Sequence, residues 1–320
     1  MGSFPPLISI LIPTWNRPQS LVRLIERINT TKHDDIEIVI VDNNSDEKNW
    51  LELVAIVPSY ANVRLFRNKA NIGMTPNWNK TIEYARGTWL GFICDDDIYK
   101  EDALLKIRSL IKDISTPCLI LQNSVIEKNI EWLEKGMETV NKIALPPASG
   151  QFWHREITDK LGGFDKRIKY CPDAEFWLRI AYCYPVLRVR DMLVIPCQHD
   201  TNYMWEAFRS PDFLQQVALS IKISSQYTLG ENCNNSIMLE YKINDGLWET
   251  LRTVLNNTFL QKNRMVNFNM YFVEFVKLSF KMNRKEKMLK ALIRLIIFRF
   301  YQPLRPSVKK LKFLISNSKL

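Results

Sequence analysis

Continuous apolar runs alternate with amphipathic segments along residues 1–125 of the chain. Uninterrupted apolar runs are typical of strands that are buried on both faces of a sheet. The predicted strands are Leu7–Pro13, Ile36–Val41, Val63–Phe66, Trp89–Cys94 and Cys118–Val125. Apolar residues at helical spacing predict helices after Pro18, over Lys48–Val57, from an N-cap at Thr75 to Ala85, and over Glu101–Lys112.

Strands that alternate with helices predict an α/β fold, with a mostly parallel, Rossmann-like sheet and helices on both faces. Residues 126–215 are more mixed, with a turn at Gly162-Gly163 and a helix over Asp173–Cys183. From Phe213 the pattern is helical to the end of the chain, with a break at Pro303–Pro306. We therefore divide the chain into residues 1–125, 126–215 and a helical C-terminal region, 216–320.

The formal net charge of +10 is concentrated at one end. Residues 281–320 contain twelve Lys or Arg and a single acid, Glu286, so the rest of the chain is close to neutral. A nucleic-acid enzyme more often carries its basic surface on the catalytic body, so we expect no nucleic-acid partner. Lys287, Lys290 and Arg294 form a basic stripe beside an apolar surface, which favours docking on an anionic membrane. The alternative is that this helix packs on the catalytic core or on a second subunit.

Two further features bear on the compartment. Six cysteines without a C-x-x-C pair indicate free thiols in a reducing environment. The longest apolar runs fall far short of the ~20 residues that a membrane helix needs. We therefore expect a cytoplasmic protein that is peripheral to the inner face of the plasma membrane, and a homo-oligomer is compatible with the sequence.

Three predicted strands end in polar segments, and ligands bind beyond the carboxyl ends of the strands of open parallel sheets. These segments are Pro13–Arg17, Asp42–Asp46 and Asp95–Asp97. The first strand is not followed by G-x-G-x-x-G, and the chain contains no Gly-Lys dipeptide, which excludes a P-loop. Three adjacent carboxylates repel one another unless a cation or hydrogen bonds compensate, and Mg²⁺ prefers such oxygen ligands. The aspartates therefore indicate a metal site or, alternatively, a solvated helix cap.

The chain resembles the family 2 glycosyltransferases with the GT-A fold. The resemblance is carried by SILIPTWNR, IVIVDNNSD, Asn71-Ile72-Gly73, Ala85-Arg86-Gly87 and FICDDD, in this order over about a hundred residues, and continues through GGFD and DAEFWLRIA. It implies transfer of a sugar from a nucleotide-diphosphate sugar to a hydroxyl acceptor, with inversion and with Mg²⁺ or Mn²⁺. Residues 1–125 would then bind the nucleotide-sugar, and residues 126–215 the acceptor.

The resemblance also assigns the donor side of the site. Pro13, Thr14 and Asn16 would edge the nucleotide pocket, Asp42 would accept a hydrogen bond from the base, and Asn71 and Gly73 would line the base. Turn formation by Asn43–Asp46 and simple capping by Asn71 are the structural alternatives. Asp95 would contact ribose and metal, Asp96 would be the primary metal ligand, Asp97 a weaker third candidate, and His199 would reach the diphosphate or metal. Many relatives have an acid at the position of Cys94, which leaves the register of the triplet open by one residue.

The resemblance also aligns Asp173, at the start of its predicted helix, with the acid of the family, which makes it the candidate base. An inverting transfer needs a group that removes the acceptor proton, and a helix start favours the ionised carboxylate. The alternative is that Asp173 only caps the helix. Glu175 is the second candidate, either for the base or for an acceptor contact.

The resulting prediction is a glycosyltransferase with a glycan or lipid-linked acceptor, in the synthesis of a bacterial surface polysaccharide such as lipopolysaccharide O-antigen or capsule. One alternative is a nucleotidyltransferase of sugar metabolism, although Leu11–Pro18 lacks the Gly-rich phosphate loop of such enzymes. The other is a non-catalytic, membrane-associated nucleotide-sugar-binding protein. Intact carboxylates at Asp42, Asp95, Asp96 and Asp173 argue against that second alternative.

Overall fold

The computed structural model describes most of the first two thirds of the chain and selected segments beyond it. The described residues are 5–29, 34–122, 126–143, 147–190, 194–195, 197, 207, 210, 212–229, 244, 247, 251, 268–281 and 283. The strands are β1 (Ile8–Thr14), β2 (Ile36–Asp42), β3 (Val63–Arg67), β4 (Trp89–Phe92), β5 (Ile98–Tyr99), β6 (Leu119–Gln122), β7 (Ile130–Leu133), β8 (Gln151–His154), β9 (Val186–Val189) and β10 (Val194–Ile195). The helices are α1 (Pro18–Ile28), α2 (Glu47–Ile56), η1 (Val57–Ser59), α3 (Met74–Tyr84), α4 (Ala103–Lys112), α5 (Met137–Lys142), α6 (Arg155–Leu161), α7 (Pro172–Cys183), α9 (Phe213–Leu229) and α11 (Phe268–Lys281).

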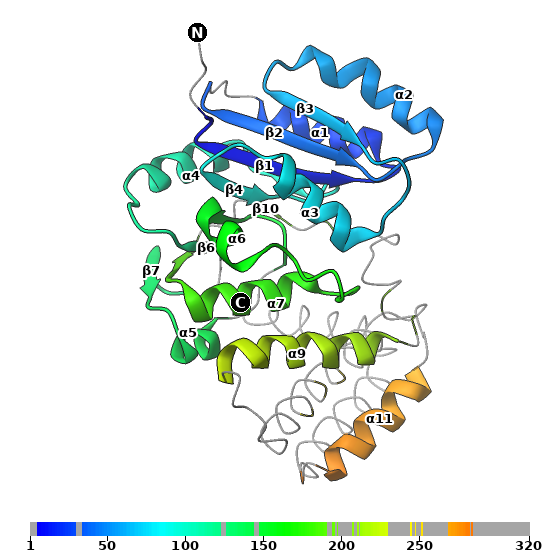
Figure 1. Cartoon of the computed structure of the whole chain (residues 1–320), viewed down its shortest axis with the longest axis vertical. Coiled ribbons are helices and arrows are strands. Elements are labelled where there is room, and N and C mark those ends of the chain that lie inside the picture. The colour runs from blue at the N-terminus through cyan, green and yellow to red at the C-terminus, as the bar shows by residue number, and fades with distance from the viewer. Residues whose placement is uncertain are drawn as a thin grey trace, which may run out of the picture. The chain divides into compact units, whose positions relative to one another are not determined.

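Eight of the described strands form one mixed sheet in the order β3-β2-β1-β4-β8-β6-β9-β7 (Figure 1). The first four strands of this order, β3, β2, β1 and β4, are parallel to one another. β8 runs antiparallel between β4 and β6, and β6 and β9 are parallel. The prediction of a mostly parallel α/β sheet is confirmed. The antiparallel strands of this sheet, β7 and β8, follow β6 in the chain, and β5 and β10 form a separate antiparallel pair.

Both faces of the sheet are covered, as the continuous apolar runs predict. Ile8, Ile10 and Ile12 of β1 pack in one apolar cluster with residues of α1, α2 and α4. Leu11, which points to the opposite face, belongs to a second cluster with residues of α6 and α7, and Trp78 of α3 packs against it. Because side chains alternate between the faces of a strand, burial of both faces leaves β1 and β2 buried along their whole length.

The start of α3 differs from the prediction. The helix begins at Met74 with Gly73 at its N-cap, so the prediction that Thr75 is the N-cap residue is wrong. Thr75 lies inside the first turn, and its buried hydroxyl donates a hydrogen bond to the carbonyl of Ile168 at 2.8 Å. Gly73 has φ of +86°, a left-handed conformation that glycine adopts without steric cost.

The chain divides into two compact units. The first comprises Met1–Asp200 and Lys222–Cys233, and the second comprises Thr201–Ile221 and Asn234–Leu320. The predicted boundary at residue 125 falls inside the first unit, where one sheet contains strands from both sides of it. Among the helices that the structure describes, none is both long and apolar enough to cross a membrane.

Candidate active site

The three polar segments identified in the sequence lie where neighbouring parallel strands end (Figure 1). Thr14, the last residue of β1, is in register with Asp42, the last residue of β2, and the buried Pro13 pairs with Val41. β4 lies on the other side of β1 and leads into the acidic turn, residues 94–97. The carboxyl ends of the parallel strands therefore bring the segments after β1, β2 and β4 together, where open α/β sheets bind ligands.

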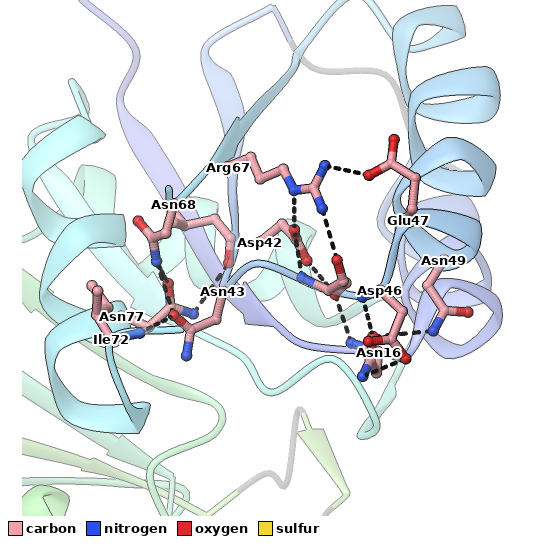
Figure 2. A network of polar contacts seen from close by, with 12 residues as sticks. Asn16, Asp42, Asn43, Asp46, Glu47, Asn49, Arg67, Asn68, Ile72 and Asn77 are labelled. Atoms are coloured by element: carbon pink, nitrogen blue, oxygen red, sulfur yellow. Dashed lines mark hydrogen bonds and ion pairs between the residues drawn. The ribbon is translucent and has the colours of Figure 1, made fainter. Parts of the chain in front are cut away.

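Asp42 is completely buried, and its carboxylate is held by its own loop and by β3 (Figure 2). The backbone N–H of Ser45 donates to Oδ2 at 3.0 Å, and the Ser45 hydroxyl donates to Oδ1. Nε of Arg67 lies 3.5 Å from the same Oδ2. Both carboxylate oxygens of Asp42 thus have partners within the protein, and they fix the loop that follows β2.

Arg67, the last residue of β3, is a residue that the sequence analysis missed. Its Nη2 donates to the carbonyl of Ser45 at 2.8 Å, and its Nη1 donates to Glu47 at 3.1 Å (Figure 2). The guanidinium also lies over the ring of Trp50, 4.8 Å from its centroid. The sequence signal that could have identified Arg67 is its place at the end of a predicted strand, because side chains at the carboxyl ends of neighbouring parallel strands converge.

A network of amide side chains holds the loop between β3 and α3 against the end of β2 (Figure 2). The Nδ2 of Asn43 donates to Oδ1 of Asn71 at 2.9 Å and to the carbonyl of Gly73 at 3.3 Å. The Oδ1 of Asn43 accepts hydrogen bonds from Nδ2 of Asn68 and from the backbone of Ile72, both at 3.0 Å. The predicted base-lining residues Asn71 and Gly73 therefore lie beside the loop of Asp42.

Asn16 joins the loop after β1 to the start of α2. The residue has φ of +55°, and its backbone N–H donates to the hydroxyl of Ser45 at 2.7 Å. Its Oδ1 accepts hydrogen bonds from the backbone of Asp46 at 2.8 Å and from Nδ2 of Asn49 at 3.1 Å. Through these contacts Asn16 holds the loop after β1 against the loop after β2. The side chain of the neighbouring Trp15 is 52% exposed.

The acidic turn contains a buried carboxylate, Asp95, that faces β1. The hydroxyl of Thr14 donates to its Oδ2 at 2.7 Å, and Nη1 of Arg17 donates to its Oδ1 at 3.1 Å. Arg17 also donates to Oδ2 of Asp96 at 2.5 Å. Burial raises the pKa of Asp95 to about 6, although the charge of Arg17 acts in the opposite direction.

The other residues of the turn form a group with the chemistry of a metal site. Cys94, Asp96 and Asp97 each offer one ligand atom, and these atoms lie within 4.8 Å of one another. Two carboxylate oxygens suit a hard divalent cation, whereas a neutral thiol does not. The prediction paired Asp95 with Asp96. The geometry instead groups Asp96 with Asp97, because Asp95 is turned towards Thr14 and Arg17.

The segment that precedes β8 connects the acidic turn to α7. The backbone N–H of Cys94 donates to the hydroxyl of Ser149 at 3.0 Å, and a hydrogen bond with Ser149 also acts on the carboxyl of Asp97. The other contact of Asp97 is with the backbone N–H of Cys197, which donates to its Oδ1 at 2.8 Å. Ser149 is 1% exposed and was not singled out in the sequence analysis, because an isolated serine in a loop carries no pattern.

Asp173 lies in the first turn of α7, after Cys171 at the N-cap and Pro172. The N-cap residue Cys171 has the left-handed φ of +55°, so Asp173 is not the N-cap residue itself. Burial raises the pKa of Asp173 to about 6, against backbone hydrogen bonds from Ala174, from Asp173 itself and from Ala148. Asp173 is therefore tied to the same segment, 148–149, that contacts the acidic turn.

The electrostatic environment of Cys94 also connects Asp173 with the acidic turn. Burial raises the pKa of the Cys94 thiol well above its usual range, and so do the charges of four surrounding carboxylates: Asp97, Asp96, Asp95 and Asp173. Such an accumulation of buried and half-buried acids is typical of functional sites. The structure thus brings Asp173, the predicted base, together with Asp95, Asp96 and Asp97 around Cys94.

Glu175 is directed away from this group. It is completely buried, and its two oxygens accept hydrogen bonds from Arg179 at 2.7 and 3.0 Å. Arg179 in turn donates to the carbonyls of Leu161 at 2.6 Å and Gly163 at 2.7 Å. Glu175 therefore stabilises the packing of α7 against the Gly162-Gly163 turn, and the geometry does not bring it to the acidic turn.

Two predicted elements lie outside the described residues. His199 is one of them. The basic tail, residues 281–320, is the other, apart from Lys281 and Asn283.

Comparison with known proteins agrees with the arrangement of the site. The model of the family described as "Glycosyl transferase family 2" matches residues 9–171, which include the acidic turn and most segments described above. An uncharacterized protein of Mycobacterium tuberculosis, MT1568, is 26% identical over 199 residues, which cover 55% of this chain and 62% of that protein. A PGL/p-HBAD biosynthesis glycosyltransferase of Mycobacterium tuberculosis is 23% identical over 223 residues, which cover 68% of this chain and 86% of the relative.

Solved structures share the fold at low sequence identity. S. aureus TarS 1-349 in complex with UDP-GlcNAc has a TM-score of 0.56 at 15% identity, with 86% of this chain and 92% of that chain covered. The mannosyltransferase PcManGT from Pyrobaculum calidifontis, in complex with GDP-Man and Mn²⁺, has a TM-score of 0.56 at 13% identity, with 94% and 88% covered. The two structures establish that this chain has a GT-A-like fold.

Proposed function

The chain belongs to glycosyl transferase family 2 and is a nucleotide-sugar-dependent glycosyltransferase, and we propose that it transfers the sugar with inversion of configuration at the anomeric carbon. In this proposal Asp173 is the base. The acceptor in this proposal is a hydroxyl of a glycan or of a lipid-linked glycan. The observation that carries the proposal is the group formed by Asp173 and the acidic turn, connected through residues 148–149. The nucleotidyltransferase alternative gains no support, because the matching family is one of glycosyltransferases.

The reaction proposed is a single displacement. The acceptor oxygen forms a bond to the anomeric carbon while the bond between that carbon and the diphosphate oxygen breaks. The acceptor proton goes to the carboxylate of Asp173, and the nucleoside diphosphate leaves with the bonding electrons. A base with a pKa of about 6 is mostly ionised at neutral pH and still more basic than an ordinary aspartate.

Asp96 and Asp97 would hold a Mg²⁺ or Mn²⁺ ion, because their oxygens converge and suit a hard cation. Such an ion neutralises the negative charge that develops on a diphosphate leaving group. The Mn²⁺ that accompanies GDP-Man in the PcManGT structure supports this part of the proposal. We propose no direct ligation by Asp95, whose two oxygens are bound by Thr14 and Arg17.

The nucleotide would lie along the loops after β1 and β2, beside Thr14, Asn71 and Gly73. In this proposal Asp42 contributes indirectly, because its buried carboxylate shapes the loop rather than facing a ligand. Asn16 contributes in the same way, through its hydrogen bonds to Ser45 and Asp46. The exposed Trp15 offers an aromatic surface next to this edge.

For the biological role we propose synthesis of a bacterial surface glycan, such as lipopolysaccharide O-antigen or capsule, at the cytoplasmic face of the membrane. The sequence feature that supports membrane docking is the basic tail, residues 281–320. Co-sedimentation with anionic liposomes tests it. Docking requires that the full chain pellets at low salt, that it is released as salt rises, and that a chain ending at residue 280 stays in solution.

The experiment that tests the donor assignment is a thermal-shift screen with UDP-, dTDP-, CDP- and GDP-sugars. Each sugar is tested with Mn²⁺ and with excess EDTA. A ligand that binds only the folded state, present at a concentration of a hundred times its Kd, stabilises the folded protein by about 2.7 kcal/mol. Such a change is readily visible as a rise in Tm. We expect one nucleotide class to stabilise, more strongly with Mn²⁺. Stabilisation that is equal in EDTA would remove the metal from the proposal, and stabilisation by no nucleotide-sugar would contradict the donor assignment.

A further inference from the structure

Arg17 holds two carboxylates of the acidic turn at once. Its Nη1 lies 3.1 Å from Oδ1 of Asp95 and 2.5 Å from Oδ2 of Asp96. Arg17 follows β1 as the N-cap residue of α1, so the ion pairs join the loop after β1 to the turn after β4. Burial lowers the pKa of Arg17, but the charges of Asp95 and Asp96 outweigh this, and the net pKa is raised.

The two carboxylates differ in their surroundings. Asp95 is also bound by the hydroxyl of Thr14, and its side chain is 7% exposed. Asp96 is also one of the three residues whose ligand atoms converge, and its side chain is more exposed, at 15%. The same carboxylate of Asp96 is therefore within reach of a guanidinium and of the position where a divalent cation would be bound.

From this geometry we propose that Arg17 competes with the divalent cation for Asp96, and that it thereby makes metal binding depend on the nucleotide-diphosphate donor. The inference rests on the metal part of the proposed function. Without the donor, the guanidinium neutralises Asp96 and lowers the affinity of the turn for a cation. A diphosphate brings negative charge to the same edge of the sheet, so it gives the displaced guanidinium a new anionic partner.

The chemistry of arginine supports such an exchange. A guanidinium forms charge-assisted hydrogen bonds with carboxylates and with phosphates in the same planar geometry, so one partner can replace the other. The side chain of Arg17 is 31% exposed, which leaves it accessible to an incoming ligand. Asp95 keeps its position when Arg17 moves, because the hydroxyl of Thr14 also binds it. Arg17 is therefore a positioning residue that acts through Asp96.

The test measures Mn²⁺ binding to the full chain by electron paramagnetic resonance of free Mn²⁺, with and without UDP and GDP. The variants are Arg17→Gln and Arg17→Lys, and the matched control is Arg23→Gln. Arg23 lies on α1 as well, and its guanidinium contacts Ser20 at 3.3 Å, outside the acidic turn. Circular dichroism and Tm establish that each variant is folded.

We expect Arg17→Gln to bind Mn²⁺ without nucleotide at least about tenfold more tightly than the natural chain, equivalent to about 1.4 kcal/mol. Arg17→Lys should fall between the two, and Arg23→Gln should match the natural chain. The nucleotide should tighten Mn²⁺ binding strongly in the natural chain and much less in Arg17→Gln. An unchanged or weaker Mn²⁺ affinity in Arg17→Gln would overturn the inference.

A second variant separates this inference from the function on which it rests. Asp96→Asn should remove Mn²⁺ binding both in the natural chain and in Arg17→Gln. If the natural chain binds Mn²⁺ with nucleotide but Arg17→Gln behaves identically, the competition is wrong and the metal site stands. If none of the proteins binds Mn²⁺ under any condition while nucleotide still raises Tm, both the competition and the metal site are wrong, and the donor assignment stands.

Discussion

The loop after β2 and the acidic turn after β4 lie at the same edge of the sheet, but they balance their polar groups in different ways. In the loop after β2, the side-chain amide of Asn43 donates to Asn71 and accepts from the backbone of Ile72, so both its N–H and its oxygen are paired. The carboxylate of Asp42 faces Ser45 and Arg67. In the acidic turn, burial raises the pKa of Asp95 to about 6, and Arg17 is shared between Asp95 and Asp96.

The difference indicates different tasks. A network whose polar groups are largely paired is rigid, and it provides a preformed surface for a ligand. A group of buried carboxylates whose pKa values are raised favours binding of a cation or a proton, so it is suited to bind metal or to take part in proton transfer. Substitutions in the two regions should therefore affect different steps, affinity for the donor in the first and chemistry in the second.

The largest effect is expected for Asp173→Asn. The amide keeps the shape of the side chain but cannot accept a proton, so turnover should fall by at least ~10²-fold. Donor binding, measured by calorimetry, should remain nearly unchanged. The matched control is Asp159→Asn on α6, an exposed carboxylate that should leave turnover intact. Near-normal turnover of Asp173→Asn would mean that another group is the base.

The pH dependence of turnover should give a smaller effect with the same origin. Because Asp173 works as the ionised base and its pKa is raised to about 6, turnover should be constant above this pH and fall as the pH is lowered through it. The expected loss is about tenfold for each pH unit below the pKa. The measurement is kcat at saturating donor and acceptor, with donor binding followed at each pH. A constant kcat down to pH 4.5 would contradict the assignment.

The smallest effect is expected in the loop after β2. Asp42→Asn replaces an acceptor of the Ser45 and Arg67 contacts, so the loop should lose part of its shape and nucleotide affinity should weaken by roughly tenfold, as for a lost hydrogen bond to a charged group. The dependence of turnover on Mn²⁺ should not change. Lys48→Gln, an exposed position on α2 just after the same loop, is the control. If Asp42→Asn changes the metal dependence, the two regions are not separate.

Sequence patterns predicted the parallel part of the fold well, because burial on both faces produces apolar runs that need no knowledge of the partner strand. The strands β7, β8 and β9 were not predicted. Each has four residues, and their pairing depends on partners distant in the chain. The start of α3 was misjudged because Thr75-Pro76 has the local signature of an N-terminus, whereas the tertiary contact of Thr75 with Ile168 decides the position.

The site follows the same rule. The segments that carry it could be named from the sequence, because polar residues after buried strands are a local signal. The partners could not be named. Glu175 and Arg179 are the exception, because an i,i+4 pair on one helix is a local signal. That Asp95 faces Thr14 and Arg17 while Asp96 joins Asp97 depends on side-chain directions within the acidic turn. Those directions are set by packing between segments far apart in sequence.

The antiparallel direction of β8 has a consequence for how this protein tolerates change in length. Because β8 runs against β4, with Gln151 opposite Phe92, the chain that enters β8 arrives where β4 ends. The connection from β6 to β8, which contains β7 and α5, therefore ends beside the acidic turn, where Ser149 contacts Cys94. We expect insertions or deletions between β6 and residue 147 to leave β1, β2 and β4 in register, because these strands pair with one another and lie outside the connection. Residues 148–149, which contact the acidic turn and Asp173, must keep their place.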